Sequence, residues 1–177
     1  MNNQDLHIHA PLIEECRKGN SRAQYLLYKQ YSRAMYNVAY RMLNNREDAE
    51  DMLQETFTDC FRHLDAFRFE STFGAWLKKI LVNKCINHIQ KKKIDLKLTD
   101  ELPEEIYEEE DEPVYDISGI IKGIEMLPDG YRIILTLYLL EGYDHSEIAQ
   151  ILGITESTSK SQYSRAKNRL RNQLSKN

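Results

Sequence analysis

The chain has 177 residues, of which 41% are hydrophobic and 29% charged, and its formal net charge is −4. This length holds one ordinary domain or two small ones, and the composition is that of a soluble protein with compact cores. No apolar run is long enough to cross a membrane, and the first five residues lack the cations of a signal peptide. We therefore expect a cytoplasmic protein that does not insert into a membrane.

The cysteines and histidines do not indicate a metal or a cofactor. Cys16, Cys60 and Cys85 are far apart and show no CxxC spacing, so we expect reduced, half-buried thiols. His7 and His9 could form a metal clip, but no cysteine or carboxylate cluster completes it. A frayed N-terminus is the preferred interpretation of that pair.

Charge is distributed unevenly along the chain. Residues 1–94 carry a net charge of +4, residues 95–116 carry −10, and residues 117–177 carry +2. Two mildly basic blocks therefore flank an acidic strip, which is more informative than the total. The strip has two prolines and little periodicity, and these features predict an extended, self-repelling linker.

The first predicted helices lie in the N-terminal block. A short helix is expected to end near Lys18, with Gly19 as its stop and Asn20 or Ser21 as the next cap. Apolar residues then recur every three or four positions, with room for one break near Tyr31. That stripe comprises Ala23, Leu26, Leu27, Tyr31, Ala34, Met35, Val38, Ala39, Met42 and Leu43.

The segment REDAEDMLQETFTDCFRHLDAF, which follows the Asn44-Asn45 turn, predicts the most amphipathic helix. The residues expected to face inward are Ala49, Met52, Leu53, Thr56, Phe57, Cys60, Phe61 and Leu64. The outer residues are Glu47, Asp48, Glu50, Asp51, Gln54, Glu55 and Asp59. Because these acids lack cation partners at i,i+4, their face is either solvated or meets a basic partner surface.

One row on this helix could instead suggest a metal site or a DNA-modifying enzyme. Glu55, Asp59 and His63 are spaced at i, i+4 and i+8. A di-metal bundle would need Glu-x-x-His pairs on other helices, and the sequence has none, so we discount this interpretation.

Aromatic and basic residues follow. The loop Phe67–Phe73 is rich in aromatics, and Ser71 or Thr72 can cap a helix over about residues 73–92. The cationic side of this helix comprises Lys78, Lys79, Lys84, His88, Lys91, Lys92 and Lys93. Exposed aromatics beside a basic helix are typical of single-stranded DNA binding. For Trp76, packing in the core and contact with a base both remain open.

The C-terminal block predicts four helices. The first apolar stripe runs from Ile117 through Ile120, Ile121 and Ile124 to Leu127, and it stops at Pro128. The second comprises Tyr131, Ile134, Leu135, Leu137, Tyr138 and Leu139, and it stops at Gly142. About 60 residues can close a small helical core.

The last two predicted helices, within residues 143–171, form a helix-turn-helix. Asp144 and Glu147 can make a capping box, Gly153 can end the first helix in a left-handed conformation, and Thr155 can cap the second. The second helix has an apolar row of Ser159, Tyr163, Ala166 and Leu170. Its other face carries donors and cations, which favours reading of the DNA major groove over simple helix packing.

Three motifs together resemble the extracytoplasmic-function group of bacterial sigma factors. They are DAEDMLQETF, FRFESTFGAWLKKILVNKCINHI and LPDGYRIILTLYLLEGYDHSEIAQILGITESTSKSQYSRAKNRLR. The resemblance, from about Leu12 to Leu174, implies an all-α fold with a region-2-like domain at 1–94 and a region-4-like domain at 117–177. The acidic linker at 95–116 would thread the channels of the polymerase.

The resemblance also implies partners and residue roles. The protein would bind core RNA polymerase and promoter DNA without being an enzyme, would be a monomer when free, and would be regulated by an anti-sigma factor. The residues implied to bind core polymerase are Asp48, Asp51, Gln54 and Glu55. Those implied to contact the minus-ten element are Phe67, Phe69, Phe73, Trp76, Asn83, Lys84 and His88. Those implied to read the minus-thirty-five element are Lys160, Ser161, Ser164 and Arg165.

Two residues depart from the pattern of this family. Phe69 stands where glycine is common in the base-capture loop, so the loop shape and the preferred base are in question. Ser159 replaces the usual valine inside the recognition helix, which should weaken packing slightly.

The rival interpretation is a stand-alone helix-turn-helix repressor or activator. It lacks support because no evident dimer interface lies outside residues 143–171.

Overall fold

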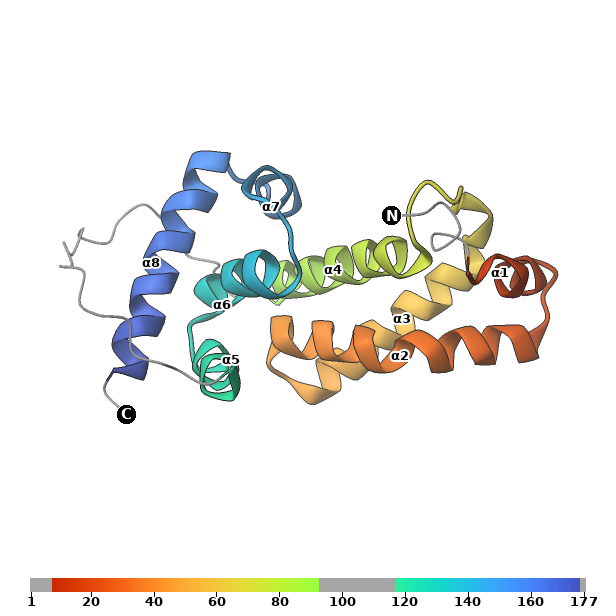
Figure 1. Cartoon of the computed structure of the whole chain (residues 1–177), viewed down its shortest axis with the longest axis horizontal. Helices are drawn as coiled ribbons and strands as arrows, with labels where there is room; N and C mark the ends of the chain where they lie inside the picture. Colours follow the sequence, from red (N-terminus) through yellow and green to blue (C-terminus); the bar gives the residue numbers. More distant parts are fainter. Residues whose placement is uncertain (1–7, 93–116, 176–177) are drawn as a thin grey trace. The chain divides into compact units, whose positions relative to one another are not determined.

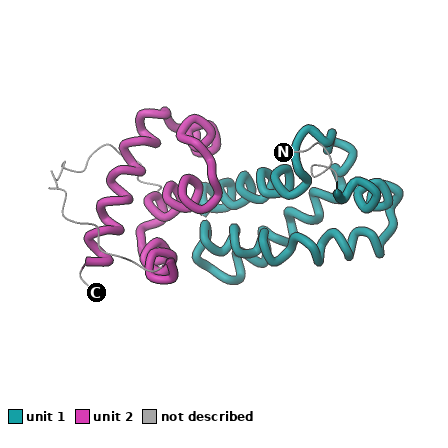
Figure 2. The backbone as a smooth tube through the Cα atoms, viewed as in Figure 1, with its two compact units in different colours: residues 1–92 teal, residues 93–177 magenta. Residues whose placement is uncertain are grey.

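The structure is a computed structural model that describes residues 8–92 and 117–175. The regular elements of these residues are all helical, in agreement with the predicted all-α fold (Figure 1). The chain divides into two compact units, residues 1–92 and 93–177 (Figure 2). The predicted linker at 95–116 lies outside the described residues. No helix in the described ranges is long and apolar enough to cross a membrane.

Unit 1 is built from helices, and its three long helices begin with side-chain caps. Its elements are α1 (Ala10–Arg17), α2 (Ser21–Leu43), α3 (Arg46–Arg62), the 3-10 turn η2 (Leu64–Ala66) and α4 (Phe73–Lys91). The side chain of Asn20 accepts from the amides of Arg22 and Ala23 at the start of α2. Asn45 and Thr72 cap α3 and α4 in the same manner. Each cap satisfies amides that the first turn of a helix leaves unpaired.

The core of unit 1 lies where α2, α3 and α4 pack together. The helix α2 is continuous, without the break allowed near Tyr31. Leu26 is 46% exposed, so its predicted inward position is wrong, because Ala23 and Leu27 already occupy the buried face at that turn. The three cysteines are buried more deeply than predicted. Burial raises the pKa values of Cys60 and Cys85 to about 12, so both thiols stay protonated.

Unit 2 contains the four predicted helices of the C-terminal block. Its elements are α5 (Ile117–Glu125), α6 (Asp129–Leu135), the π-helical turn η3 (Thr136–Leu140), α7 (His145–Leu152) and α8 (Glu156–Leu174). One buried cluster joins α5, α6 and α8 and comprises Ile124, Leu127, Leu135, Ala166 and Leu170. Ile117 and Leu139 are 78% and 46% exposed, so their predicted core positions are wrong. Each lies at or near the end of its helix, where the apolar row leaves the packed face.

The corner between α7 and α8 has the geometry that the sequence predicts. Asp144 and Glu147 form a complete capping box at the start of α7. Gly153 ends α7 with φ 68, a left-handed conformation that glycine adopts without steric cost. The Thr155 side chain accepts from the amide of Thr158 and begins α8. The tight turn thus sets α7 against α8.

Candidate functional site

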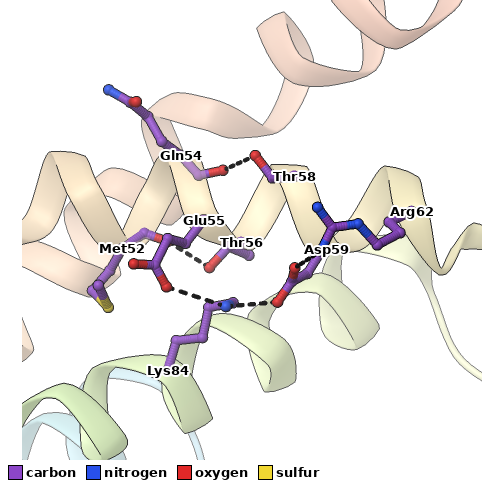
Figure 3. Close-up of polar contacts among 8 residues, drawn as sticks. All are labelled: Met52, Gln54, Glu55, Thr56, Thr58, Asp59, Arg62 and Lys84. Atoms are coloured by element: carbon purple, nitrogen blue, oxygen red, sulfur yellow. Dashed lines mark hydrogen bonds and ion pairs between the residues drawn. The ribbon is translucent and has the colours of Figure 1, made fainter.

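Lys84 of α4 lies between two carboxylates of α3 (Figure 3). Its Nζ is 2.7 Å from Oδ2 of Asp59 and 3.3 Å from Oε2 of Glu55, and its side chain is only 19% exposed. Burial lowers the pKa of Lys84, but the hydrogen bonds to Asp59 and Glu55 outweigh it and the pKa is raised. The hydrogen bond from Lys84 also holds the pKa of Asp59 below its usual range. Lys84 therefore links the two helices through salt bridges.

A second set of ion pairs joins the start of α3 to the C-terminal end of α4. Nζ of Lys92 is 2.7 Å from Oδ2 of Asp48, and Nε2 of His88 is 3.2 Å from Oδ1 of the same carboxylate. The hydrogen bond from Lys92 lowers the pKa of Asp48, although partial burial opposes the shift. Because Lys84, His88 and Lys92 recur every four residues, one row of α4 meets one acidic row of α3.

We call the contacts of Lys84, His88 and Lys92 with the acidic row of α3 the ladder. This ladder corrects two features of the sequence interpretation. The acids of α3 were expected to lack cation partners at i,i+4, but Arg46 lies 2.9 Å from Glu50 at that spacing. Asp48, Glu55 and Asp59 also find partners in the α4 row. Lys84 and His88 were expected to lie open to DNA phosphates, but both side chains turn toward α3. Each row was recognisable in the sequence, whereas their mutual contact depends on how the helices pack.

A different row of α3 remains open to solvent. Asp51 and Gln54, two of the predicted polymerase contacts, are exposed, and so are Glu47 and Thr58. These four positions recur at i, i+4, i+7 and i+11, so they share one helix face. Among the described residues, Asp51 has no ion pair. The sequence interpretation placed Glu47 on the outer face but missed Thr58, although its spacing signals it.

The predicted base-contacting aromatics separate into buried and accessible rings. Phe67 and Phe73 are 2% and 3% exposed. Their centroids lie 5.6 Å apart, and Phe73 also packs on Tyr31 at 5.1 Å. These two rings fill the core beneath the loop, so their contact with a base stays a prediction. The half-buried Trp76 covers them, with its centroid 5.2 Å from that of Phe67.

Phe69 and Asn83 are the more accessible members of the predicted minus-ten residues. Phe69 is partly exposed and has φ 59, so a phenylalanine holds the left-handed conformation at the position where glycine is usual in the resembling family. Asn83 is exposed on α4. It follows Trp76 by two helical turns and therefore shares a face with it. A base could stack on and hydrogen-bond to such a surface.

The predicted minus-thirty-five residues on the recognition helix α8 differ in exposure to solvent. Lys160 and Ser164 are exposed, and Ser161 and Arg165 are half-buried. Nζ of Lys160 lies 2.7 Å from Oε1 of Glu156, an exposed surface pair that DNA can displace at little cost. These side chains form one polar face of the helix. They can donate hydrogen bonds to base edges and phosphates.

Ser159 lies fully buried behind this face. Its Oγ is 3.0 Å from Nδ1 of His145, the first residue of α7. The His145 ring stacks on Tyr138, with the centroids 4.6 Å apart, and meets Tyr163 at 5.5 Å. The serine therefore adds a hydrogen bond between the two helices of the motif, where the sequence predicted only weaker packing.

The row of Glu55, Asp59 and His63 does not come together as a metal site. Glu55 and Asp59 point to Lys84, and His63 is exposed at the end of α3. Within residues 8–92 and 117–175, no group of three or more His, Cys, Asp or Glu side chains is placed to hold a metal ion.

Comparison with known proteins supports a common origin for both units. The model of sigma-70 region 2 matches residues 27–94, and that of sigma-70 region 4 matches residues 119–170. The ECF RNA polymerase sigma factor SigW of Bacillus subtilis is 31% identical over 92% of this chain and 94% of its own length. The ECF RNA polymerase sigma-E factor of Escherichia coli K12 is 29% identical, with 92% of each chain covered.

Solved structures agree with these matches. The sigma factor RpoE from Bartonella quintana, solved in complex with the anti-sigma factor NepR, is 26% identical, with a TM-score of 0.56. The match covers 86% of this chain and 96% of that one. CnrH, solved with the cytosolic domain of CnrY, has a TM-score of 0.55 at 21% identity and supports the fold.

A unit that matches sigma-70 region 2, followed by a helix-turn-helix unit that matches region 4, is the architecture of a transcription initiation factor. The chain belongs to the sigma-70 family of RNA polymerase sigma factors, in its extracytoplasmic-function group. A sigma factor binds core RNA polymerase and directs it to promoter DNA.

Proposed function

We propose that the described surfaces divide the work of a sigma factor among them. The exposed α3 face around Asp51 and Gln54 contacts core polymerase, with Asp48 and Glu55 at its border. Phe69, Trp76 and Asn83 form the surface that captures an unpaired base of the minus-ten element, and Phe67 and Phe73 support it from below. Lys84 and His88, which pair with α3 in the ladder, lie next to this surface on α4. Lys160, Ser161, Ser164 and Arg165 read the minus-thirty-five element.

The order of the two family matches along one chain is the observation that carries this proposal. A stand-alone repressor needs only the helix-turn-helix, whereas residues 27–94 match the region-2 model and carry the acidic face and the aromatic loop. The same order supports the proposed division into domains at 1–94 and 117–177 with a linker at 95–116. Because polymerase supplies the active site, the chain is a specificity factor and not an enzyme. Its place of action is the cytoplasm.

Regulation belongs to the same proposal. The similar RpoE structure contains an anti-sigma factor. A protein of that class would control this chain by covering the surfaces that polymerase needs, and we propose that the free chain is a monomer.

Sequencing of transcript starts tests the function directly. Purified chain is added to core polymerase on genomic DNA, and starts are compared with those from core alone. We expect new starts that share two upstream elements. Tight duplex binding without polymerase, combined with no new starts, would favour the stand-alone repressor instead.

A further inference from the structure

Arg17, the last residue of α1, reaches across to the aromatic loop nearly 50 residues away in the sequence. Its Nη2 donates to the backbone oxygen of Leu64 at 3.3 Å and to that of Phe67 at 2.5 Å. Its guanidinium carbon lies 5.2 Å from the centroid of the Phe69 ring. One side chain therefore holds two points of the loop backbone and the ring at its left-handed residue.

The guanidinium is itself fixed in place. Nη1 lies 2.6 Å from Oε1 of Glu14, one turn earlier on α1, and Nε lies 3.8 Å from Oδ1 of Asp65. The Arg17 side chain is 21% exposed. Arginine suits this position because its planar fork can donate in several directions while one face lies on an aromatic ring. A lysine ammonium cannot match both functions.

The loop depends on contacts of this kind for its shape. Residues 67–72 contain no helix or strand, so no repeating backbone ladder fixes them. Phe69 holds φ 59 within this segment, a left-handed conformation that is sterically unfavourable for a residue with a side chain. Such a conformation persists only where its surroundings hold it. Arg17 contacts the ring of that residue and the carbonyl two residues before it.

We propose that Arg17 is a positioning residue for base capture, which sets the preference for the captured base without contacting DNA. This inference rests on the proposed role of Phe69, Trp76 and Asn83. Arg17 sets where the Phe69 ring stands relative to Trp76 and Asn83, and thereby sets the shape into which an unpaired base must fit. The preference thus depends on α1, an element outside the base-capture surface.

A set of four promoter templates tests the inference. The templates differ only in the captured base of the minus-ten element, which is taken from the promoter that the sequenced transcript starts define. Wild type, Arg17→Ala and Arg17→Lys are each combined with core polymerase, and initiation rates are measured on all four. We expect both variants to lose about tenfold of the preference for the best base, the order of effect that misplacement of a positioned group causes. Core affinity should stay near that of wild type.

Two further measurements separate the outcomes. Arg22→Ala removes an exposed cation at the start of α2 and should keep the wild-type preference. In the free chain, amides of residues 68–71 should exchange hydrogen faster in Arg17→Ala than in Arg22→Ala.

If wild type initiates at a defined promoter and both Arg17 variants keep its base preference, the inference is overturned. A uniform loss on all four templates, with core affinity falling in parallel, would also overturn it, because Arg17 would then only hold the fold together. Failure of wild type to initiate would instead count against the proposed function, and the exchange rates would still report on the Arg17 contacts.

Discussion

Phe69 places a large side chain at a backbone conformation that suits glycine. Its φ of 59 carries a steric cost, while its ring gains contacts with Phe67, at a centroid distance of 4.8 Å, and with Arg17. The cost and the gain have opposite signs and similar size. Truncation of this residue separates the two contributions.

Replacing Phe69 by glycine and by alanine should give different stabilities. Both variants lose the ring, but only alanine keeps the left-handed strain, so Phe69→Ala should be less stable than Phe69→Gly by about 1 kcal/mol. Unfolding in denaturant, followed by circular dichroism, measures both free energies. At a position without positive φ, alanine would be the more stable of the two. That order would contradict the strained loop.

Ser159 illustrates a buried polar residue that the sequence could not explain. We expect Ser159→Ala to lower the free energy of unfolding by about 0.5–1.5 kcal/mol, because the hydrogen bond to His145 is lost. Ser157→Ala, at an exposed position in the first turn of the same helix, is the matched control and should change little. Equal effects of the two substitutions would mean that the bond of Ser159 to His145 contributes nothing.

At the scale of elements, the acidic helix α3 has two polar rows, and only one of them meets a neighbouring helix. The row of Asp48, Glu55 and Asp59 is paired with α4, and the row containing Asp51 and Gln54 faces solvent. The two rows should therefore respond differently to pH and to charge reversal. One prediction addresses each row.

The paired row should make the fold sensitive to acid. The folded state lowers the pKa of Asp48 below its unfolded value of about 4, so the pair stabilises the fold at neutral pH, and this contribution is lost as the pH falls through the folded pKa. We expect Asp48→Asn to be less stable than wild type at pH 7 and to show a flatter loss of stability toward acid. Asp51→Asn, on the solvent-facing row, should retain the wild-type pH dependence. Thermal unfolding at a series of pH values checks both, and identical curves for the two variants would argue against the ladder.

The open row should govern the affinity for core polymerase. Asp51→Arg places a cation on a surface proposed to meet a basic partner, so we expect about a tenfold or greater loss of core binding, as reversal of a charge at an interface causes. Glu15→Arg makes the same change on α1 and should bind core normally. Titration of labelled core polymerase measures both affinities. If Asp51→Arg binds as tightly as wild type, this face of α3 is only a solvated one.

Helix positions, caps and the α7–α8 corner could be predicted because they depend on local chemistry. Asn20, Thr155 and Gly153 act on residues within one turn of themselves. The contacts of Arg17 with the loop, and of Lys84 with Asp59, could not be predicted, because each needs the relative placement of helices distant in sequence. The burial of Phe67 and Phe73 has the same cause. Aromatic composition indicates a cluster but not which rings it exposes.

For the molecule as a whole, the separation of charge along the chain is the remaining feature with a functional consequence. The +4 and +2 blocks are joined through a stretch of −10, most dense in the EEEDE run at residues 108–112. An acidic stretch in the same chain as two surfaces proposed to bind DNA repels DNA and competes for their cations. The free chain should therefore bind DNA weakly until polymerase engages it.

Neutralising that run should strengthen DNA binding by the free chain. Replacing the four glutamates by glutamine and Asp111 by asparagine removes five negative charges. We expect affinity for promoter duplex to rise about tenfold at low salt, as field effects of this kind do. The gain should disappear near 0.5 M salt, where the screening length is only about 4 Å. Fluorescence anisotropy with a labelled promoter measures both conditions. A variant with the run reversed to EDEEE keeps every charge and should behave as wild type. If the reversed variant gains as much as the neutralised one, the order of residues in the run and not its charge is responsible. If neither variant gains, weak binding by the free chain comes from the folded units themselves.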